Sequence, residues 1–234
     1  MAEPQMIYGT FKEETKNRFL CQVTIDGEDV ECYIPSSCRL ENFIDMKGRT
    51  VLLRHNQAKN ARTQYAIYAV KIKNEYLLLN LSQANRIIEA ALPNRRFSFL
   101  GPRKQIIREK IIGDYKSDLY IADSKTLLEV KSILSFQRTA LFPTVYSERG
   151  IKQLAQLSSL LDEGFKACYL FVSFNHRVKD IRINDGIEEY ARLFDACLEK
   201  GMTIYGVTVK MKDGRPIIHS TIPALIRHQH IRCD

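Results

Sequence analysis

Four charged residues between positions 109 and 131 have the types and the spacing for phosphodiester chemistry. Glu129 and Lys131 are two residues apart in a stretch of β-forming residues, so both side chains lie on one face of a strand. If the stretch around Asp118 forms a hairpin with that strand, its carboxylate reaches the same face, and Glu109 lies in the stretch before it. Paired carboxylates are suited to Mg²⁺ or Mn²⁺, and a nearby Lys is suited to orienting a water nucleophile or neutralising phosphate charge. The alternative is an ordinary polar, solvent-facing side of an antiparallel sheet.

The second part of the chain has the alternation of strands and helices that would position these residues. Residues 148–162 predict an amphipathic helix with Ser147 as its N-cap, and 166–174 predict a buried strand. A second helix is expected over 187–199. The remaining expected strands are 104–112, 117–122, 126–133, 203–210 and 216–221. This order predicts an α/β domain with a central mixed sheet.

The first part of the chain predicts a small barrel. Its expected strands are 18–25, 30–34, 50–55, 64–72 and 76–81. Short strands without a long helix are typical of an OB-fold, a barrel that often binds nucleic acid. Ser82 is then expected to cap a helix over 83–92. We therefore predict an OB-fold-like, nucleic-acid-binding domain over residues 1–81 and an α/β domain over 82–234.

The positive charge of the chain is concentrated where the two predicted domains join. The 234 residues include 35 Lys and Arg against 27 Asp and Glu, a net charge of +8. Residues 86–110 contain seven basic and two acidic side chains, with Phe97 and Phe99 among them. Basic side chains interleaved with aromatic rings suit a phosphate backbone and stacked bases. The alternative is a solvated linker.

Other features exclude several classes of protein. No apolar run approaches the roughly 18 to 20 residues that cross a bilayer, and the first residues do not resemble a signal peptide. The six cysteines are dispersed without a CxxC pair, which is typical of reduced thiols rather than of a disulfide framework or a zinc site. Signature loops of serine hydrolases, P-loop NTPases and dinucleotide enzymes are absent from the sequence. We expect a cytoplasmic protein that does not associate with membranes.

Several motifs resemble the sugar fermentation stimulation protein (SfsA) family along nearly the whole chain. They are Asn17-Arg18-Phe19-Leu20, the stretch 80–86 (NLSQANR), 128–132 (LEVKS) and 142–154 (FPTVYSERGIKQL). The resemblance implies an N-terminal OB-fold joined to a PD-(D/E)XK restriction-endonuclease-like domain, and a nucleic-acid-binding protein. It places Glu109, Asp118, Glu129 and Lys131 at the nuclease core positions, with Asp118, Glu129 and Glu109 as the metal ligands.

The resemblance also points to nucleic-acid contacts. Arg149, Lys152 and Gln153 are expected on or just before the helix that flanks the active face. Together with the basic segment, the expected contacts are Arg18, Arg86, Arg95, Arg96, Arg103, Lys104, Arg149, Lys152 and Gln153. The chain departs from the family at Thr144, where Asp is usual, and at Gln153, where His is usual. These departures are consistent with an altered substrate or a weakened activity.

Three functions remain open from the sequence. The first is a Mg²⁺- or Mn²⁺-dependent nuclease acting on DNA or RNA. The second is a non-catalytic DNA-binding regulatory protein, linked to sugar metabolism, on a nuclease-like scaffold. The third is a protein-interaction domain whose basic segment is only a linker. The sequence does not fix the oligomeric state.

Overall fold

The computed structural model describes residues 6–35, 39–40, 44–56 and 60–225. It divides into two compact units, residues 1–83 with 209–217, and residues 84–208 with 218–234. The predicted ranges, 1–81 and 82–234, did not anticipate that the segment 209–217 groups with the first unit. That segment is the tip of a hairpin far along the chain, made of two strand ends and the turn at 213–214, and local sequence carries no signal for the unit with which such a tip groups.

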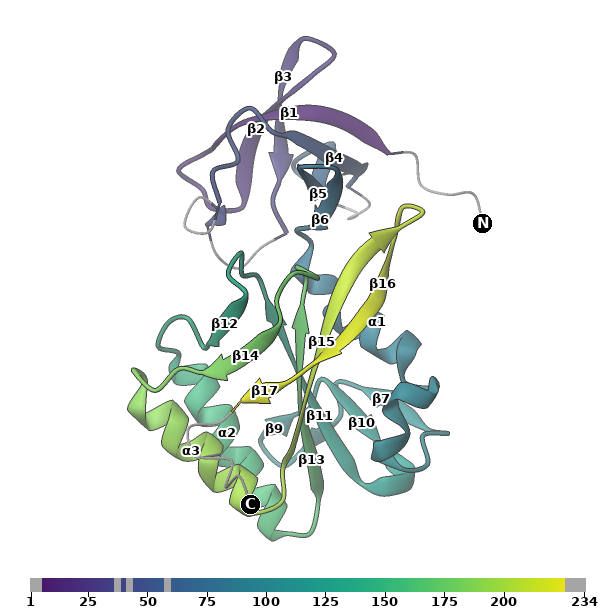
Figure 1. The fold of residues 1–234 in the computed structure, drawn as a ribbon, viewed down its shortest axis with the longest axis vertical. Helices are drawn as coiled ribbons and strands as arrows, with labels where there is room; N and C mark the ends of the chain where they lie inside the picture. Colours follow the sequence, from purple (N-terminus) through teal and green to yellow (C-terminus); the bar gives the residue numbers. More distant parts are fainter. Residues whose placement is uncertain (1–5, 36–38, 41–43, 57–59, 226–234) are drawn as a thin grey trace, which may run out of the picture. The chain divides into compact units, whose positions relative to one another are not determined.

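The first unit is an OB-fold barrel (Figure 1), as predicted. Its strands are β1 (Ile7–Glu14), β2 (Leu20–Ile25), β3 (Glu28–Tyr33), β4 (Thr50–His55), β5 (Tyr65–Ile72) and β6 (Glu75–Leu78). Strands follow the order β3-β2-β1-β4-β5-β6, and a parallel pairing of β3 with β5 closes the first five into a barrel. Inward-facing side chains such as Val23, Leu53 and Ile67 fill the interior. Closure leaves few free strand edges.

The five barrel strands are not the five that the sequence predicted. The prediction missed β1, because Phe11 is its only buried residue and the strand therefore lacks an apolar alternation. It counted 76–81 instead, which corresponds to β6 and pairs with β5 outside the closed ring. Ser82 lies in a 3-10 turn, η2 (Leu81–Gln83), and donates to Asn80 Oδ1 rather than capping helix α1 (Ala84–Ala91).

Most of the second unit is built on a six-stranded mixed sheet in the order β16-β15-β13-β11-β10-β7, of which the ends of β15 and β16 at 209–217 group with the first unit. Strands β11 (Thr126–Ile133), β13 (Lys166–Ser173) and β15 (Thr203–Lys212) run parallel, whereas β10 (Leu119–Ile121) is antiparallel to both β11 and β7 (Ile106–Arg108). Strand β16 (Arg215–Ile222) completes the sheet. The central strand β11 has the bounds that the sequence predicted.

Helices α2 (Glu148–Asp162) and α3 (Glu188–Glu199) pack side by side in the second unit (Figure 1). The Ser147 side chain accepts a hydrogen bond from the Gly150 N–H, which confirms the predicted N-cap. Their buried faces enclose an aromatic core in which Tyr169 and Phe194 meet edge to face with ring centroids 5.2 Å apart. Such rings contribute large buried apolar areas and fix β13 against the helices.

Shorter elements connect this framework. They are η3 (Arg95–Leu100), β8 (Ile111–Ile112), β9 (Tyr115–Lys116), η4 (Ala122–Ser124), β12 (Thr139–Phe142), β14 (Asp180–Ile183) and β17 (Ala224–Leu225). The predicted strand 104–112 is interrupted, because Glu109 adopts a left-handed φ of 51° that ends β7. The predicted strand 117–122 is shortened to β10. Strands β12, β14 and β17 form a small parallel sheet that the sequence did not predict.

Candidate active site

Glu129 lies in the middle of the central sheet and is only 2% exposed. Strand β11, which carries it, is flanked by β10 and β13. The Tyr115 hydroxyl donates to Glu129 Oε2 at 2.8 Å, and Lys131 Nζ lies 2.5 Å from Oε1. A carboxylate in the interior is costly unless it is paired and hydrogen-bonded. Here each of its oxygens has a donor.

The electrostatic balance around Glu129 disfavours the ionised form. Burial raises the pKa of the Glu129 carboxyl, and the nearby negative charge of Asp118 raises it further. The Lys131 ammonium and the Tyr115 hydroxyl act in the opposite direction without cancelling the effect of burial. Additional positive charge beside Glu129 would therefore favour its ionised form.

Lys131 is held by groups from three elements. Besides its ion pair with Glu129, its Nζ donates to Gln153 Oε1 of α2 at 3.0 Å. The same ammonium lies 5.5 Å from the ring centroid of Tyr169 on β13. The structure thus brings Gln153 into the site as an anchor for the lysine, although the sequence predicted it as a nucleic-acid contact.

Asp118 stands immediately before β10, where the ladder between β10 and β11 ends. Its Oδ2 accepts a hydrogen bond from the Val130 N–H at 2.8 Å, and its Oδ1 accepts one from Asn85 Nδ2 at 3.1 Å. The backbone carbonyl of Asp118 accepts the Glu109 N–H at 3.1 Å. These contacts fix the carboxylate next to the strand that carries Glu129.

Asn85 and Tyr115 are site residues that the sequence reasoning missed. Asn85 belongs to the segment 80–86, which served only as a family motif, and it reaches Asp118 from α1. Tyr115 lies between the expected strands 104–112 and 117–122, and it is fully buried on β9. No spacing rule links either residue to the carboxylates, because both come from other elements.

The carboxylate of Glu109 lies outside the cluster formed by Asp118, Glu129 and Lys131. Its side chain is largely exposed and forms an ion pair with Lys116, whose ammonium lowers the pKa of the Glu109 carboxyl. The left-handed turn at Glu109 explains this placement, since the residue no longer follows the side-chain alternation of β7. Of the four predicted residues, Asp118, Glu129 and Lys131 gather, and Glu109 contributes its backbone N–H.

The predicted nucleic-acid contacts have different environments. Most lie exposed on helical segments of the second unit or beside them: Arg86, Arg95, Arg96, Lys104, Arg149 and Lys152. Arg103 is instead turned inward, because its guanidinium donates to the carbonyls of Leu92 and Gly101 after α1. Arg18, in the first unit, lies over the ring of Phe19 with its guanidinium carbon 4.7 Å from the centroid.

The donor set of Asp118 and Glu129 fits a hydrated divalent cation rather than an enclosed metal site. Within the described ranges, no group of three or more His, Cys, Asp or Glu side chains could hold a metal ion. Magnesium commonly uses one or two carboxylates and completes its shell with water and substrate phosphate. The two carboxylates supply such ligands.

The fold and the site define a class: a barrel of OB topology followed by a mixed-sheet domain, with a carboxylate and a lysine on its central strand β11 and a second carboxylate beside that strand. Residues 82–215 match the family model described as "Sugar fermentation stimulation protein RE domain", and residues 14–79 match "SfsA N-terminal OB domain". The chain belongs to the sugar fermentation stimulation protein family.

Relatives cover most of the chain. A sugar fermentation stimulation protein homolog of Clostridium kluyveri is 29% identical over 177 residues, covering 74% of this chain and 76% of the relative. A homolog of Desulforamulus reducens is 25% identical and covers 92% and 93%. The solved structure of Pyrococcus furiosus SfsA in complex with Ca²⁺ has a TM-score of 0.82 at 20% identity, covering 97% and 98% of the two chains. At that identity the structural likeness establishes the fold. No helix in the described part of the chain is long and apolar enough to span a membrane.

Proposed function

We propose that this chain binds DNA or RNA and hydrolyses phosphodiester bonds with Mg²⁺ or Mn²⁺ at Asp118 and Glu129. The observation that carries the proposal is the buried carboxylate of Glu129, held between Tyr115 and Lys131 with Asp118 close enough to raise its pKa. Perturbed carboxylates beside a fixed lysine are typical of catalytic sites. A purely structural role does not explain a charged residue at the centre of a sheet, because an apolar side chain would stabilise that position at least as well.

Two further observations support the proposal. The first unit is an OB domain, a fold that commonly binds single-stranded nucleic acid, and exposed basic residues are concentrated in 86–110. The Pyrococcus furiosus protein of the same fold was solved with Ca²⁺. We extend divalent-cation binding to the two carboxylates of this chain.

Each residue of the site would have a distinct role. Asp118 and Glu129 would hold the cation, whose charge would polarise the phosphoryl group of the substrate. Lys131, oriented by Glu129 and Gln153, would neutralise charge that develops at the phosphate or position the attacking water. Asn85 and Tyr115 would keep the carboxylates in place. The left-handed backbone at Glu109 carries its carboxylate away to Lys116, so we assign it no metal ligation.

A cleavage assay tests the enzymatic part. Labelled single-stranded DNA, duplex DNA and RNA are incubated with the full chain in Mg²⁺, in Mn²⁺ or in EDTA. Product is expected only with a divalent cation. The Glu129→Gln variant, which keeps the side-chain shape, is expected to lose at least about a hundredfold in rate while it still binds nucleic acid. Glu199→Gln, an exposed carboxylate at the end of α3, is the matched control and should cleave normally.

A second function is favoured by one observation. Both carboxylate oxygens of Glu129 are already engaged, by Tyr115 and by Lys131, as in a purely structural buried ion pair. A non-catalytic DNA-binding regulatory protein would retain this arrangement. It predicts salt-sensitive binding and no product with any cation. Cation-independent binding that is identical in the parent chain and in Glu129→Gln, without cleavage, would support this second function and refute the first.

A further inference from the structure

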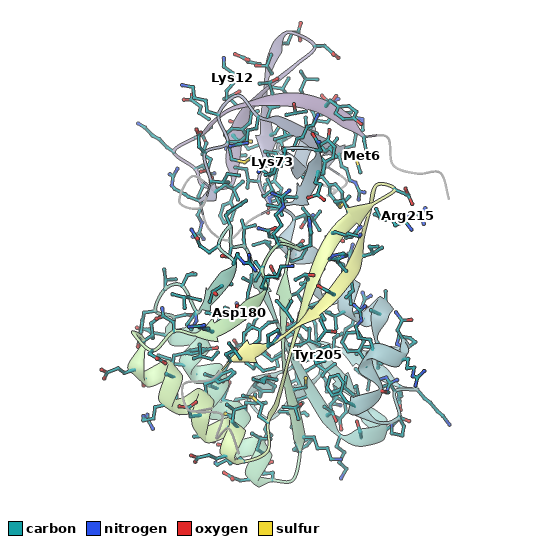
Figure 2. All side chains as sticks on the ribbon, viewed as in Figure 1. Met6, Lys12, Lys73, Asp180, Tyr205 and Arg215 are labelled. Carbon is teal, nitrogen blue, oxygen red and sulfur yellow. The ribbon has the colours of Figure 1, made fainter. Side chains whose placement is uncertain are left out.

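The aromatic residues of the basic segment have different environments. Phe97 is fully buried, whereas Phe99, two residues later in η3, is 46% exposed. The Phe99 ring stacks on Tyr205 of β15, with ring centroids 4.6 Å apart and planes inclined by 34°. Figure 2 labels Tyr205 on its strand. Of these three rings, Phe99 and Tyr205 are therefore the two that are not fully buried.

Hydrogen bonds and aromatic packing hold the Phe99 and Tyr205 rings in place. The Tyr205 hydroxyl donates to the Arg96 carbonyl at 3.3 Å and is 3.0 Å from Thr221 Oγ1. Phe97 packs beneath both rings, with its centroid 5.6 Å from that of Tyr205 and 6.4 Å from that of Phe99. The 3-10 turn and β15 are thus joined by a hydrogen bond and by aromatic packing. A fixed ring loses little conformational entropy when a planar ligand stacks on it.

Positive charge flanks the same pair. Arg95 and Arg96 are exposed in the same 3-10 turn, and among the described residues neither guanidinium has an acidic partner. By contrast, Arg108 is paired with Glu89, and Arg103 donates to backbone carbonyls. The guanidinium groups of Arg95 and Arg96 are therefore available to a ligand beside the exposed rings.

We propose that Phe99, stacked on Tyr205, is a base-stacking platform for single-stranded nucleic acid, with Arg95 and Arg96 contacting the adjoining phosphates. The inference rests on the proposed nucleic-acid function and names its substrate class. Stacking on Phe99 requires a base whose face is free, which a paired duplex does not offer. A single exposed apolar side chain needs no explanation by itself. The rigid aromatic support and the two adjacent arginines are what point to a ligand with both π faces and negative charge.

The sequence allows a direct test, because the chain contains no tryptophan. Phe99→Trp places a single fluorophore at the platform, and Leu141→Trp, at a position 51% exposed on β12, is the matched control. Oligothymidylate of about 16 nucleotides, a length that spans a typical site, is titrated in EDTA while anisotropy of the labelled strand reports binding independently. We expect saturable quenching at position 99, none at 141, and little with a duplex.

Affinity measurements separate stacking from charge. Phe99→Leu keeps the apolar volume and removes the π face, and we expect it to weaken binding about tenfold at every salt concentration. Arg95→Ala and Arg96→Ala should each lower the slope of log affinity against log salt by about one. Phe99→Leu should leave that slope unchanged.

The outcomes distinguish the two proposals. Binding by anisotropy with unchanged fluorescence at position 99, or equal quenching by duplex, would overturn the platform and leave nucleic-acid binding intact. Absence of binding at low salt would overturn both the platform and the proposed function. If a variant of the carboxylates, such as Glu129→Gln, loses cleavage while the fluorescence of Trp introduced by Phe99→Trp is still quenched by the single strand, the platform is supported independently of catalysis.

Discussion

Replacing Tyr115 by Phe tests whether Glu129 is held as an ionised carboxylate. The substitution keeps the buried ring and removes one oxygen, which donates to Glu129 Oε2 at 2.8 Å. Hydrogen bonds to charged groups contribute about 1.5–3 kcal/mol, more than the roughly 1 kcal/mol of a neutral pair. We expect a loss of about 1.5–3 kcal/mol in the free energy of unfolding at neutral pH, because Oε2 is left without that donor in a site that excludes water.

The loss should depend on pH in a defined direction. Burial already raises the pKa of Glu129, and losing the Tyr115 hydroxyl raises it further, since that hydrogen bond lowers it. A group whose folded-state pKa is raised loses its contribution to stability as pH rises through that pKa. In acid, where Glu129 is protonated in both chains, the variant should therefore lose only the roughly 1 kcal/mol of a neutral hydrogen bond. The difference should grow as pH rises and reach its full size once Glu129 is ionised in the variant.

Urea denaturation at about pH 7 and about pH 4.5 measures both effects, because the raised pKa of Glu129 leaves it protonated at the lower value and it ionises as pH rises. Tyr190→Phe is the matched control: its hydroxyl lies 2.7 Å from that of Tyr169, a buried pair in which neither group is charged. Burial raises the pKa of both tyrosines, so neither ionises over this range. The control should cost about 1 kcal/mol at both pH values. Equal losses for Tyr115→Phe at the two pH values would refute an ionised Glu129.

Three other substitutions test the supports of the site and of the fold. Asn85→Ala removes the side-chain donor to Asp118 and should weaken cation binding by about tenfold in calorimetric titration, as loss of a ligand-orienting partner does; unchanged affinity would count against Asp118 as a ligand. Ser147→Ala removes the N-cap of α2 and should lower the free energy of unfolding by about 1 kcal/mol in urea. Gly206→Ala places a Cβ 2.6 Å from the Ile222 carbonyl oxygen and should lower the free energy of unfolding by about 1–3 kcal/mol in urea. An unchanged free energy of unfolding would show that β15 and β16 can move apart at this point without cost.

The sequence predicted those parts of the fold whose signals are local. Strand β11 and helix α2 were located to the residue, because a run of β-forming residues that follows a turn and a capped amphipathic stretch are each complete within one segment. Strand β1 was missed since its only buried side chain is Phe11, and the rest of its pairing comes from β2 and β4. A strand defined by its neighbours has no alternation of its own to detect.

The residues of the site also divide into those that local spacing predicts and those that only the fold brings together. Glu129 and Lys131 share a strand, so their spacing was enough to place them together, and a hairpin argument was enough for Asp118. Glu109 was expected in the cluster on the assumption of an unbroken strand 104–112; the left-handed turn at this residue interrupts that strand, and the carboxylate pairs with Lys116. Asn85 approaches from a helix more than thirty positions earlier, and no periodicity connects it to Asp118.

The placement of Glu129 is difficult to explain by stability alone. A carboxylate in the central strand of a sheet costs free energy when it is desolvated, and a buried ion pair such as that with Lys131 commonly returns no more than well-packed apolar side chains would. The neighbouring charge of Asp118 adds to the cost, as the raised pKa of Glu129 reflects. The chain nevertheless places hydrogen-bond donors from β9, β11 and α1 around the two carboxylates. Local features that oppose stability while their geometry is closely fixed are typical of functional sites. A divalent cation between the carboxylates would turn their mutual repulsion into a shared attraction, which is the physical reason for proposing metal-dependent chemistry here.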